Sequence, residues 1–156
     1  MKKIKKRMIL FFMVIVSQLQ TSCGSLGAFE QIEFSVSKEK MDLAIEKLFI
    51  EYPEYKIPEE WIKFNDWSKR GYDFLDGKIF YFKSEPQELY YISYFTPELS
   101  NTINPTLKLA IRAINSGNER WLLSEDLSKS EIKRIETRFR SEIIPKLEKY
   151  TQSKSK

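Results

Sequence analysis

The spacing of apolar residues predicts a strand and then a helix at the start of the region with domain-like sequence. Between residues 31 and 37 apolar and polar side chains alternate, which is the period of a half-buried strand. From residue 38 to Pro53 apolar residues recur every three or four positions, and Ser37 fits the N-cap of the resulting helix. Its apolar face consists of Met41, Ala44, Ile45, Leu48, Phe49 and Tyr52. Pro53 should end the helix, because proline cannot donate a backbone hydrogen bond.

Aromatic and β-branched residues predict further strands in the middle of the chain. The turn dipeptide Asp76-Gly77 lies between two aromatic-rich runs and predicts a hairpin. Residues 89–95 read as another strand. Residues 106–114 fit either a strand or a helix, and the turn-like sequence "NSGN" that follows favours a strand, with "RWLL" as its returning partner. Residues 57–71 lack clean periodicity and predict a short helix or an ordered loop that closes one end of the core.

The last element is an amphipathic helix that follows a capping-box spacing. Ser128 and Glu131 stand three residues apart, directly before a run with helical periodicity. Pro145 should kink or divide this helix, because its ring clashes with the preceding turn. Together these elements predict an α+β fold, a two-layer sandwich in which helices cover one face of an antiparallel sheet of four or five strands.

The first sixteen residues have the pattern of an export signal. The segment "MKKIKKR" carries five positive charges, and the nine residues "MILFFMVIV" that follow are all apolar. A helix needs about 20 apolar residues to cross the hydrocarbon core of a bilayer, so this run is too short for a permanent transmembrane span. We therefore expect a signal helix that is cleaved from the protein.

The chain's single cysteine follows this apolar run. Thr21 and Ser22 lead into Cys23, and Gly24 and Ser25 follow it. This stretch resembles the lipobox of bacterial lipoproteins, although Gln20 stands where leucine is common. The resemblance implies a diacylglyceryl group on Cys23 and cleavage just before it. The alternative is an ordinary signal cut within "GSLGAF". An unpaired thiol in an oxidising compartment is chemically awkward, which favours lipidation.

Cleavage before Cys23 would divide the chain and change its charge. We expect a signal peptide over residues 1–22, a lipidated tether over 23–30, one globular domain over 31–150 and a frayed polar tail over 151–156. The whole chain has 26 basic and 22 acidic residues, but five basic ones precede Cys23. The mature protein would then be near neutral, and the net charge would no longer favour nucleic acid as a partner.

The residue inventory excludes several kinds of catalysis. The chain has no histidine, so it cannot form a Ser-His-Asp triad or an imidazole metal site. None of its five glycines stands in a phosphate-binding motif. We expect no metal and no cofactor. Carboxylate chemistry remains, for which the densest acidic stretch consists of Glu59, Glu60, Asp66, Asp73 and Asp76.

Strand alternation also predicts a second face of the sheet, turned away from the helices. Phe80, Phe82, Tyr90, Ile92, Tyr94, Leu107, Leu109, Ile111 and Ala113 should face the helices. The opposite face would then present Tyr81, Tyr91, Lys108 and Arg112, a mixture typical of protein contact surfaces. Alternatively, these are ordinary residues of a sheet face, and residues 57–71 cover it.

These observations favour a lipid-anchored protein of the bacterial cell envelope, held outside the cytoplasm on the outer or inner membrane. Its domain would bind or scaffold an envelope protein or polymer without catalysis. A periplasmic inhibitor or immunity-type lipoprotein is the alternative, and a carboxylate-dependent glycosidase is the third candidate.

Overall fold

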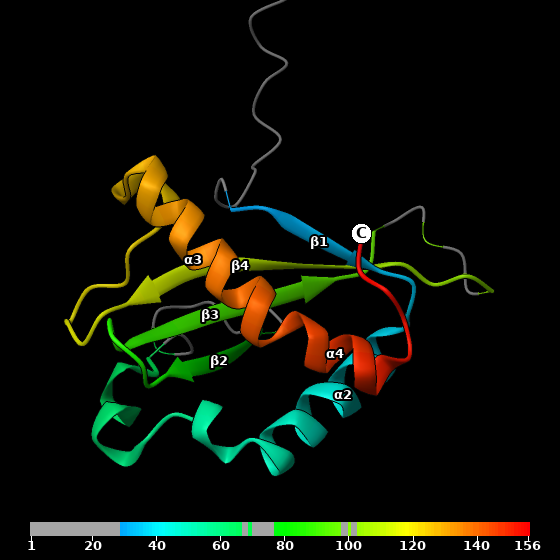
Figure 1. The fold of residues 1–156 in the computed structure, drawn as a ribbon, viewed down its shortest axis with the longest axis horizontal. Helices are drawn as coiled ribbons and strands as arrows, with labels where there is room; N and C mark the ends of the chain where they lie inside the picture. Colours follow the sequence, from blue (N-terminus) through cyan, green and yellow to red (C-terminus); the bar gives the residue numbers. More distant parts are fainter. Residues whose placement is uncertain (1–28, 67–68, 70–76, 98–99, 101–102) are drawn as a thin grey trace, which may run out of the picture.

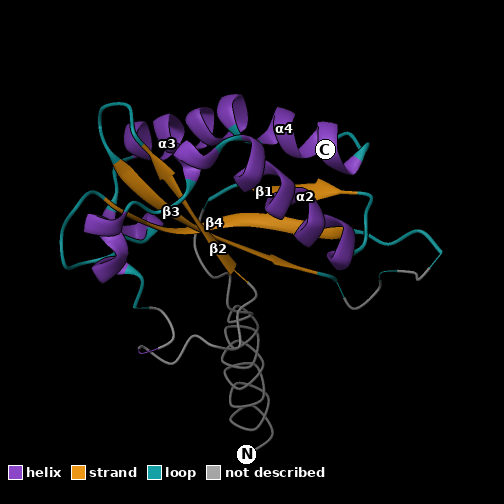
Figure 2. Cartoon of the chain, turned by 90° about the horizontal axis from the view of Figure 1, so that it is seen from below, coloured by secondary structure: helices purple, strands orange, loops and turns teal. Residues whose placement is uncertain are grey.

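The computed structural model describes residues 29–66, 69, 77–97, 100 and 103–156, and residues 1–22 with the expected signal helix lie outside this part. Four antiparallel strands form one sheet in the order β1-β4-β3-β2 (Figure 1). The strands are β1 (Gln31–Phe34), β2 (Gly77–Phe82), β3 (Glu88–Phe95) and β4 (Leu107–Asn115). The α-helices lie on one face of the sheet (Figure 2). The α+β sandwich predicted from the sequence is confirmed.

Three α-helices form the second layer, α2 (Lys38–Glu51), α3 (Lys129–Glu142) and α4 (Ile144–Thr151). The Ser37 side chain caps α2 by accepting the Lys40 N–H. Ser128 and Glu131 form the predicted capping box of α3. Pro145 lies in the first turn of α4, where a missing N–H leaves no helical hydrogen bond unmade, and it divides the last helix as expected. No helix in the described part of the chain is both long and apolar enough to span a membrane.

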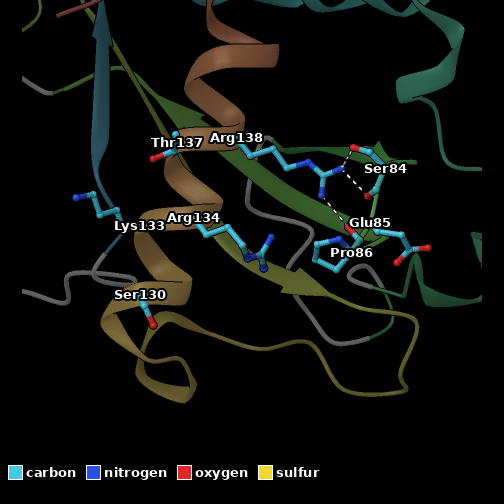
Figure 3. A pocket seen from close by; sticks show the side chains of 8 residues that line it. All are labelled: Ser84, Glu85, Pro86, Ser130, Lys133, Arg134, Thr137 and Arg138. Carbon is cyan, nitrogen blue, oxygen red and sulfur yellow. Dashed lines mark hydrogen bonds between the residues drawn. The ribbon is translucent and has the colours of Figure 1, made fainter.

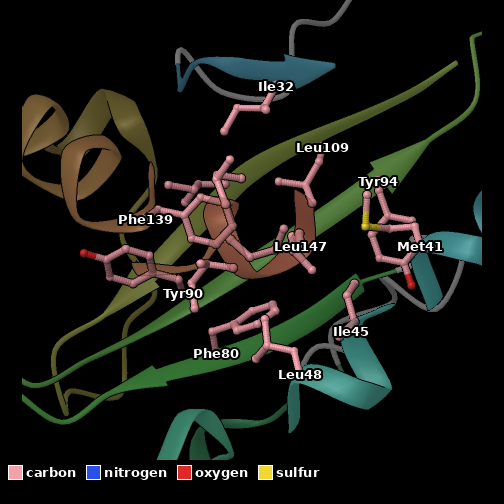
Figure 4. Close-up of a cluster of buried hydrophobic side chains, with 14 of the residues drawn as sticks. Ile32, Met41, Ile45, Leu48, Phe80, Tyr90, Tyr94, Leu109, Phe139 and Leu147 are labelled. Carbon is pink, nitrogen blue, oxygen red and sulfur yellow. The ribbon is translucent and has the colours of Figure 1, made fainter. Parts of the chain in front are cut away.

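The main core lies between the sheet and these helices (Figure 4). Met41, Ile45 and Leu48 of α2 are fully buried, as their periodicity predicts. Phe139 of α3 meets Phe80 of β2 edge to face, with ring centroids 6.1 Å apart. The predicted inward residues of β2 and β3 belong to this core, so their alternation is confirmed.

A β-bulge in β4 corrects the predicted alternation of that strand. Ile92 pairs with Ile111 but Tyr91 pairs with Ala113, so Arg112 is an extra residue in the ladder. Ile114 therefore faces the helices, and Ala113 belongs to the opposite face together with Tyr91. The expectation that Ala113 points at the helices is wrong, because an inserted residue reverses the alternation beyond it.

The opposite face of the sheet carries a second apolar cluster under a 3₁₀ helix, η2 (Glu59–Phe64). Trp61 packs on Tyr81 with ring centroids 5.4 Å apart. Trp121 donates its indole N–H to the Phe64 carbonyl at 3.1 Å. This helix covers the outer face of the sheet, the arrangement considered as the alternative above. A shorter 3₁₀ helix, η1 (Pro53–Tyr55), leads into it from α2.

Two predicted hairpins are only partly found in the described residues. Gly77 is the first residue of β2, paired with Ser93, and residues 71–76 of the expected hairpin lie outside the described residues. The hairpin that the structure describes joins β2 to β3 through residues 83–87, with a cis peptide bond before Pro86. The segment "RWLL" forms only one bridge, Ile114 to Leu122, and a 3₁₀ turn, η4 (Ser124–Asp126), follows it.

Both ends of the described domain are fixed to β1 or α3. Phe29 is buried in the main core, and the Glu30 carboxylate pairs with Arg140 of α3. The predicted frayed tail is instead ordered: Lys156 and Glu33 exchange backbone hydrogen bonds of 2.9 and 3.2 Å at the free edge of β1. The Glu148 carboxylate holds this tail through the backbone N–H of Ser155. Residues 29 and 30 and residues 155 and 156 therefore pack against the rest of the domain.

Candidate functional site

A pocket of about 490 Å³ lies between α3 and the turn that joins β2 to β3 (Figure 3). The turn contributes a loop wall, and α3 contributes basic and hydroxyl side chains. The residues that line the pocket are Ser84, Glu85, Pro86, Ser130, Lys133, Arg134, Thr137 and Arg138. Polar groups gather here more densely than in the apolar clusters on the two faces of the sheet, so this pocket is our candidate site.

A buried carboxylate organises the basic side of the pocket. Glu88 begins β3 and its side chain is only 1% exposed. Arg134 donates two hydrogen bonds to it, of 2.9 and 2.6 Å, in a bidentate pair. The Tyr90 hydroxyl donates a third at 3.0 Å. Burial, and then the charge of Glu88, raise the pKa of Tyr90, so its phenol stays protonated and remains a donor.

Arg138 connects α3 to the turn. Its guanidinium donates to the carbonyls of Ser84 and Pro86, both at 2.7 Å, and to the Glu142 carboxylate at 3.2 Å (Figure 3). It also lies over the Phe82 ring, 4.8 Å from the centroid. A guanidinium has five N–H donors in a planar fork, and the two that remain go to the Ser84 hydroxyl and to the Glu88 carboxylate, so all five are used. Arg138 therefore holds the wall of the pocket in place and has little capacity left for a ligand.

Arg134 and Lys133 have donors that these contacts do not use. Arg134 gives two of its five N–H groups to Glu88, and its side chain is 39% exposed. Lys133 is exposed and points away from the turn (Figure 3). The hydrogen bond to Glu88 raises the pKa of Arg134, so its charge is permanent. This edge of the pocket can therefore bind an anionic group by charge and by hydrogen bonds.

The structure separates the residues that we expected to form a contact surface. Tyr81 and Tyr91 are only 7% and 5% exposed, because η2 and Trp121 cover them. They point away from the α-helices as predicted, but the expectation that they lie on an open face is wrong. The alternative drawn from the sequence, that part of the segment 57–71 covers this face, is the one that the structure shows.

The two basic residues of that expected surface lie on the same face but remain partly accessible. Arg112, the bulged residue of β4, donates its Nε–H to the Ser93 hydroxyl and lies 5.9 Å from the centroid of the Phe95 ring. Burial lowers the pKa of Arg112. Lys108 is half-buried and stands opposite Glu33 of β1 in the sheet register. The four residues therefore do not form one exposed patch.

The acidic stretch considered for carboxylate chemistry is only partly described. Glu59 and Glu60 are exposed in the first turn of η2, and residues 73 and 76 lie outside the described residues. Asp66 lines a separate pocket of about 380 Å³. Glu119 supplies a second carboxylate there, and the other lining residues are Lys63, Phe64 and Trp121. Within the described ranges no group of three or more metal-ligating side chains comes together.

Reasoning from the sequence missed the Glu88 network. Cys23, the predicted lipid-attachment residue, lies outside the described residues. One available signal was the spacing of Arg134 and Arg138, which stand four residues apart and so share one flank of a helix. Comparisons with family models, with curated proteins and with solved structures found no match for the chain.

Proposed function

We propose that this chain is exported and held on a bacterial membrane by a lipid on Cys23, and that its domain binds or scaffolds an envelope partner without catalysis. The observation that carries the proposal is the order of segments in the sequence. A basic start, a nine-residue apolar run and small residues lead to the single cysteine. The buried residue Phe29 follows only six positions later, so Cys23 stands directly before a folded domain.

The chemistry of the candidate pocket supports a binding role. Its buried carboxylate is bonded to two arginines and a tyrosine, and Arg138 is bonded to the turn. These contacts stabilise the fold and fix the pocket walls. What remains at the surface is a set of cationic and hydroxyl donors beside the exposed carboxylate of Glu85, and the donors can bind an anionic group.

Processing of the full-length chain in a bacterial host tests the anchor. The wild type should incorporate labelled palmitate and lose residues 1–22, which gives a shorter band on a gel. A Cys23→Ser variant should remain at precursor length without label. The matched control Ser22→Ala keeps a small residue before the cysteine and should be processed like the wild type. Normal shortening of Cys23→Ser, with no label in the wild type, would contradict the proposal.

Crosslinking in intact envelopes tests the binding role and separates it from its alternative. We expect one partner to be recovered repeatedly with the wild-type protein and identified by mass spectrometry. A partner that is an enzyme, and that loses activity when the purified chain is added, would indicate an inhibitor or immunity-type protein instead of a scaffold.

A further inference from the structure

The outward side of α3 carries only basic and hydroxyl residues. At about 100° per residue, the positions on this side fall within an arc of about 140°. We call this set the basic face of α3: Lys129, Ser130, Lys133, Arg134, Thr137, Arg140 and Ser141. The carboxylates of the helix, Glu131, Glu136 and Glu142, project outside this arc.

The side chains of the basic face are available to a partner. All except Arg134 and Arg140 are exposed, and these two are half-buried. Arg134 and Arg140 are oriented by Glu88 and Glu30, whereas Lys129 and Lys133 form no ion pair with any described residue. The face therefore offers two lysines without an ion pair to a described residue, two arginines in ion pairs and the Thr137 hydroxyl, whereas the Ser141 hydroxyl donates to the Arg138 carbonyl and the Ser130 hydroxyl is hydrogen-bonded to Ser128, both at 3.0 Å. Such a surface complements a layer of phosphate groups.

The start of the domain lies beside this face. Glu30 pairs with Arg140 at 2.7 Å, and its backbone N–H donates to the Glu136 carboxylate at 2.7 Å. Phe29 stands six positions after Cys23, and at full extension this segment spans at most about 22 Å. The basic face runs about 16 Å along the helix, from Arg140 back to Lys129. A lipid on Cys23 would therefore hold this face close to the bilayer surface.

We propose that the basic face of α3 lies on the anionic phospholipid surface of the membrane that holds the anchor. This inference rests on the lipidation of Cys23 proposed above. The tether keeps the domain near the surface, and the four cations of the face select the orientation by their attraction to lipid phosphates. The Thr137 hydroxyl can donate a hydrogen bond to the same phosphates. The face of the sheet that carries η2 then points away from the membrane.

Amine labelling of the native lipidated protein tests this orientation. The full-length gene product, purified from envelopes, is reconstituted into vesicles of phosphatidylcholine alone or mixed equally with phosphatidylglycerol. A membrane-impermeant amine reagent is added, and mass spectrometry measures its reaction at each lysine relative to detergent-solubilised protein. Lys63 on η2 is exposed on the other side of the sheet and serves as the internal control.

We expect Lys129 and Lys133 to react several-fold more slowly than Lys63 on the anionic vesicles, and salt should remove the difference because it screens the attraction. A Lys129→Gln variant should weaken the protection of Lys133, whereas Lys40→Gln on α2 should leave it unchanged. Equal labelling of the three lysines, or equal protection on both kinds of vesicle, would overturn the inference while leaving the anchor intact. An unmodified Cys23 peptide in the same sample would overturn the anchor and this orientation together.

Discussion

A methyl group added at Gly77 should destabilise the domain because of one neighbouring ring. A Cβ built on Gly77 would lie 2.5 Å from Oη, 2.6 Å from Cζ and 2.7 Å from Cε2 of Tyr91. Carbon atoms in contact are normally about 3.5 to 4.0 Å apart, so the overlap is about 1 Å. The ring cannot easily move away, because it is 5% exposed and packs edge to face on Trp121.

The size of the effect follows from these contacts. Overpacking of a core costs about 1 to 3 kcal/mol, so Gly77→Ala should lower the free energy of unfolding by that amount. Tyr91→Ala should itself cost about 3 to 5 kcal/mol, as for other buried aromatic side chains. Without the ring, alanine should be better than glycine in a strand by about 0.5 to 1 kcal/mol. The two substitutions should therefore be coupled by about 2 to 4 kcal/mol.

Urea unfolding of the four proteins of this double-mutant cycle measures the coupling. Residues 23–156 with Cys23→Ser serve as the parent, and tryptophan fluorescence and circular dichroism report the transition. Gly117→Ala is the matched control. Gly117 has φ of 84°, so its substitution should cost about the same with or without the Tyr91 ring. An equal cost of Gly77→Ala in both backgrounds would refute the reasoning.

Three further predictions concern the core, the pocket and the tail. Leu48→Ala and Phe139→Ala should each lower the free energy of unfolding by about 2 to 5 kcal/mol, and an unchanged urea midpoint would contradict their burial. Glu88→Ala should lower the free energy of unfolding by about 3 kcal/mol or more, because it leaves two arginines without their buried carboxylate. If urea unfolding shows a change of less than about 0.5 kcal/mol, the network is dispensable for stability. The hydrogen bond from Lys154, and then the backbone N–H of Ser155, lower the pKa of Glu148 to about 2. Its stabilisation of the tail should therefore be complete above about pH 4.5 and lost as the pH falls toward 2. The protection of residues 153–156 against hydrogen exchange, measured relative to the intrinsic rate at each pH, should fall in that window and should be low at every pH in Glu148→Ala. Protection that is unchanged by both the pH and the substitution would exclude this role.

Much of the fold could be predicted because its elements have regular patterns. The alternation of residues 31–37, the capping box at Ser128 and the position of Pro145 each follow from local rules, and the structure agrees with all three. The strand assignment of residues 106–114 is also confirmed. The bulge at Arg112 could not be predicted, because one inserted residue preserves a strand-like pattern while reversing the side chains beyond it.

The candidate site was harder to predict because it depends on contacts between distant segments. Charged residues are usually assigned to the surface, so the sequence gives no reason to bury Glu88. Its burial is possible only because the strand start meets Arg134 and Arg138 of α3, about 50 residues later. The covering of Tyr81 and Tyr91 by η2 was one of two alternatives that the sequence left open, because an aperiodic segment does not decide which surface it covers.

The most direct test of the central proposal is the mass of the N-terminal peptide of the native protein, purified from bacterial envelopes. The proposal predicts that the mature chain begins at Cys23 and carries two or three acyl chains, which hold a protein on a bilayer far more firmly than one chain does. An unmodified N-terminus downstream of Cys23, or an intact residue 1 to 22 segment on the mature chain, would contradict it.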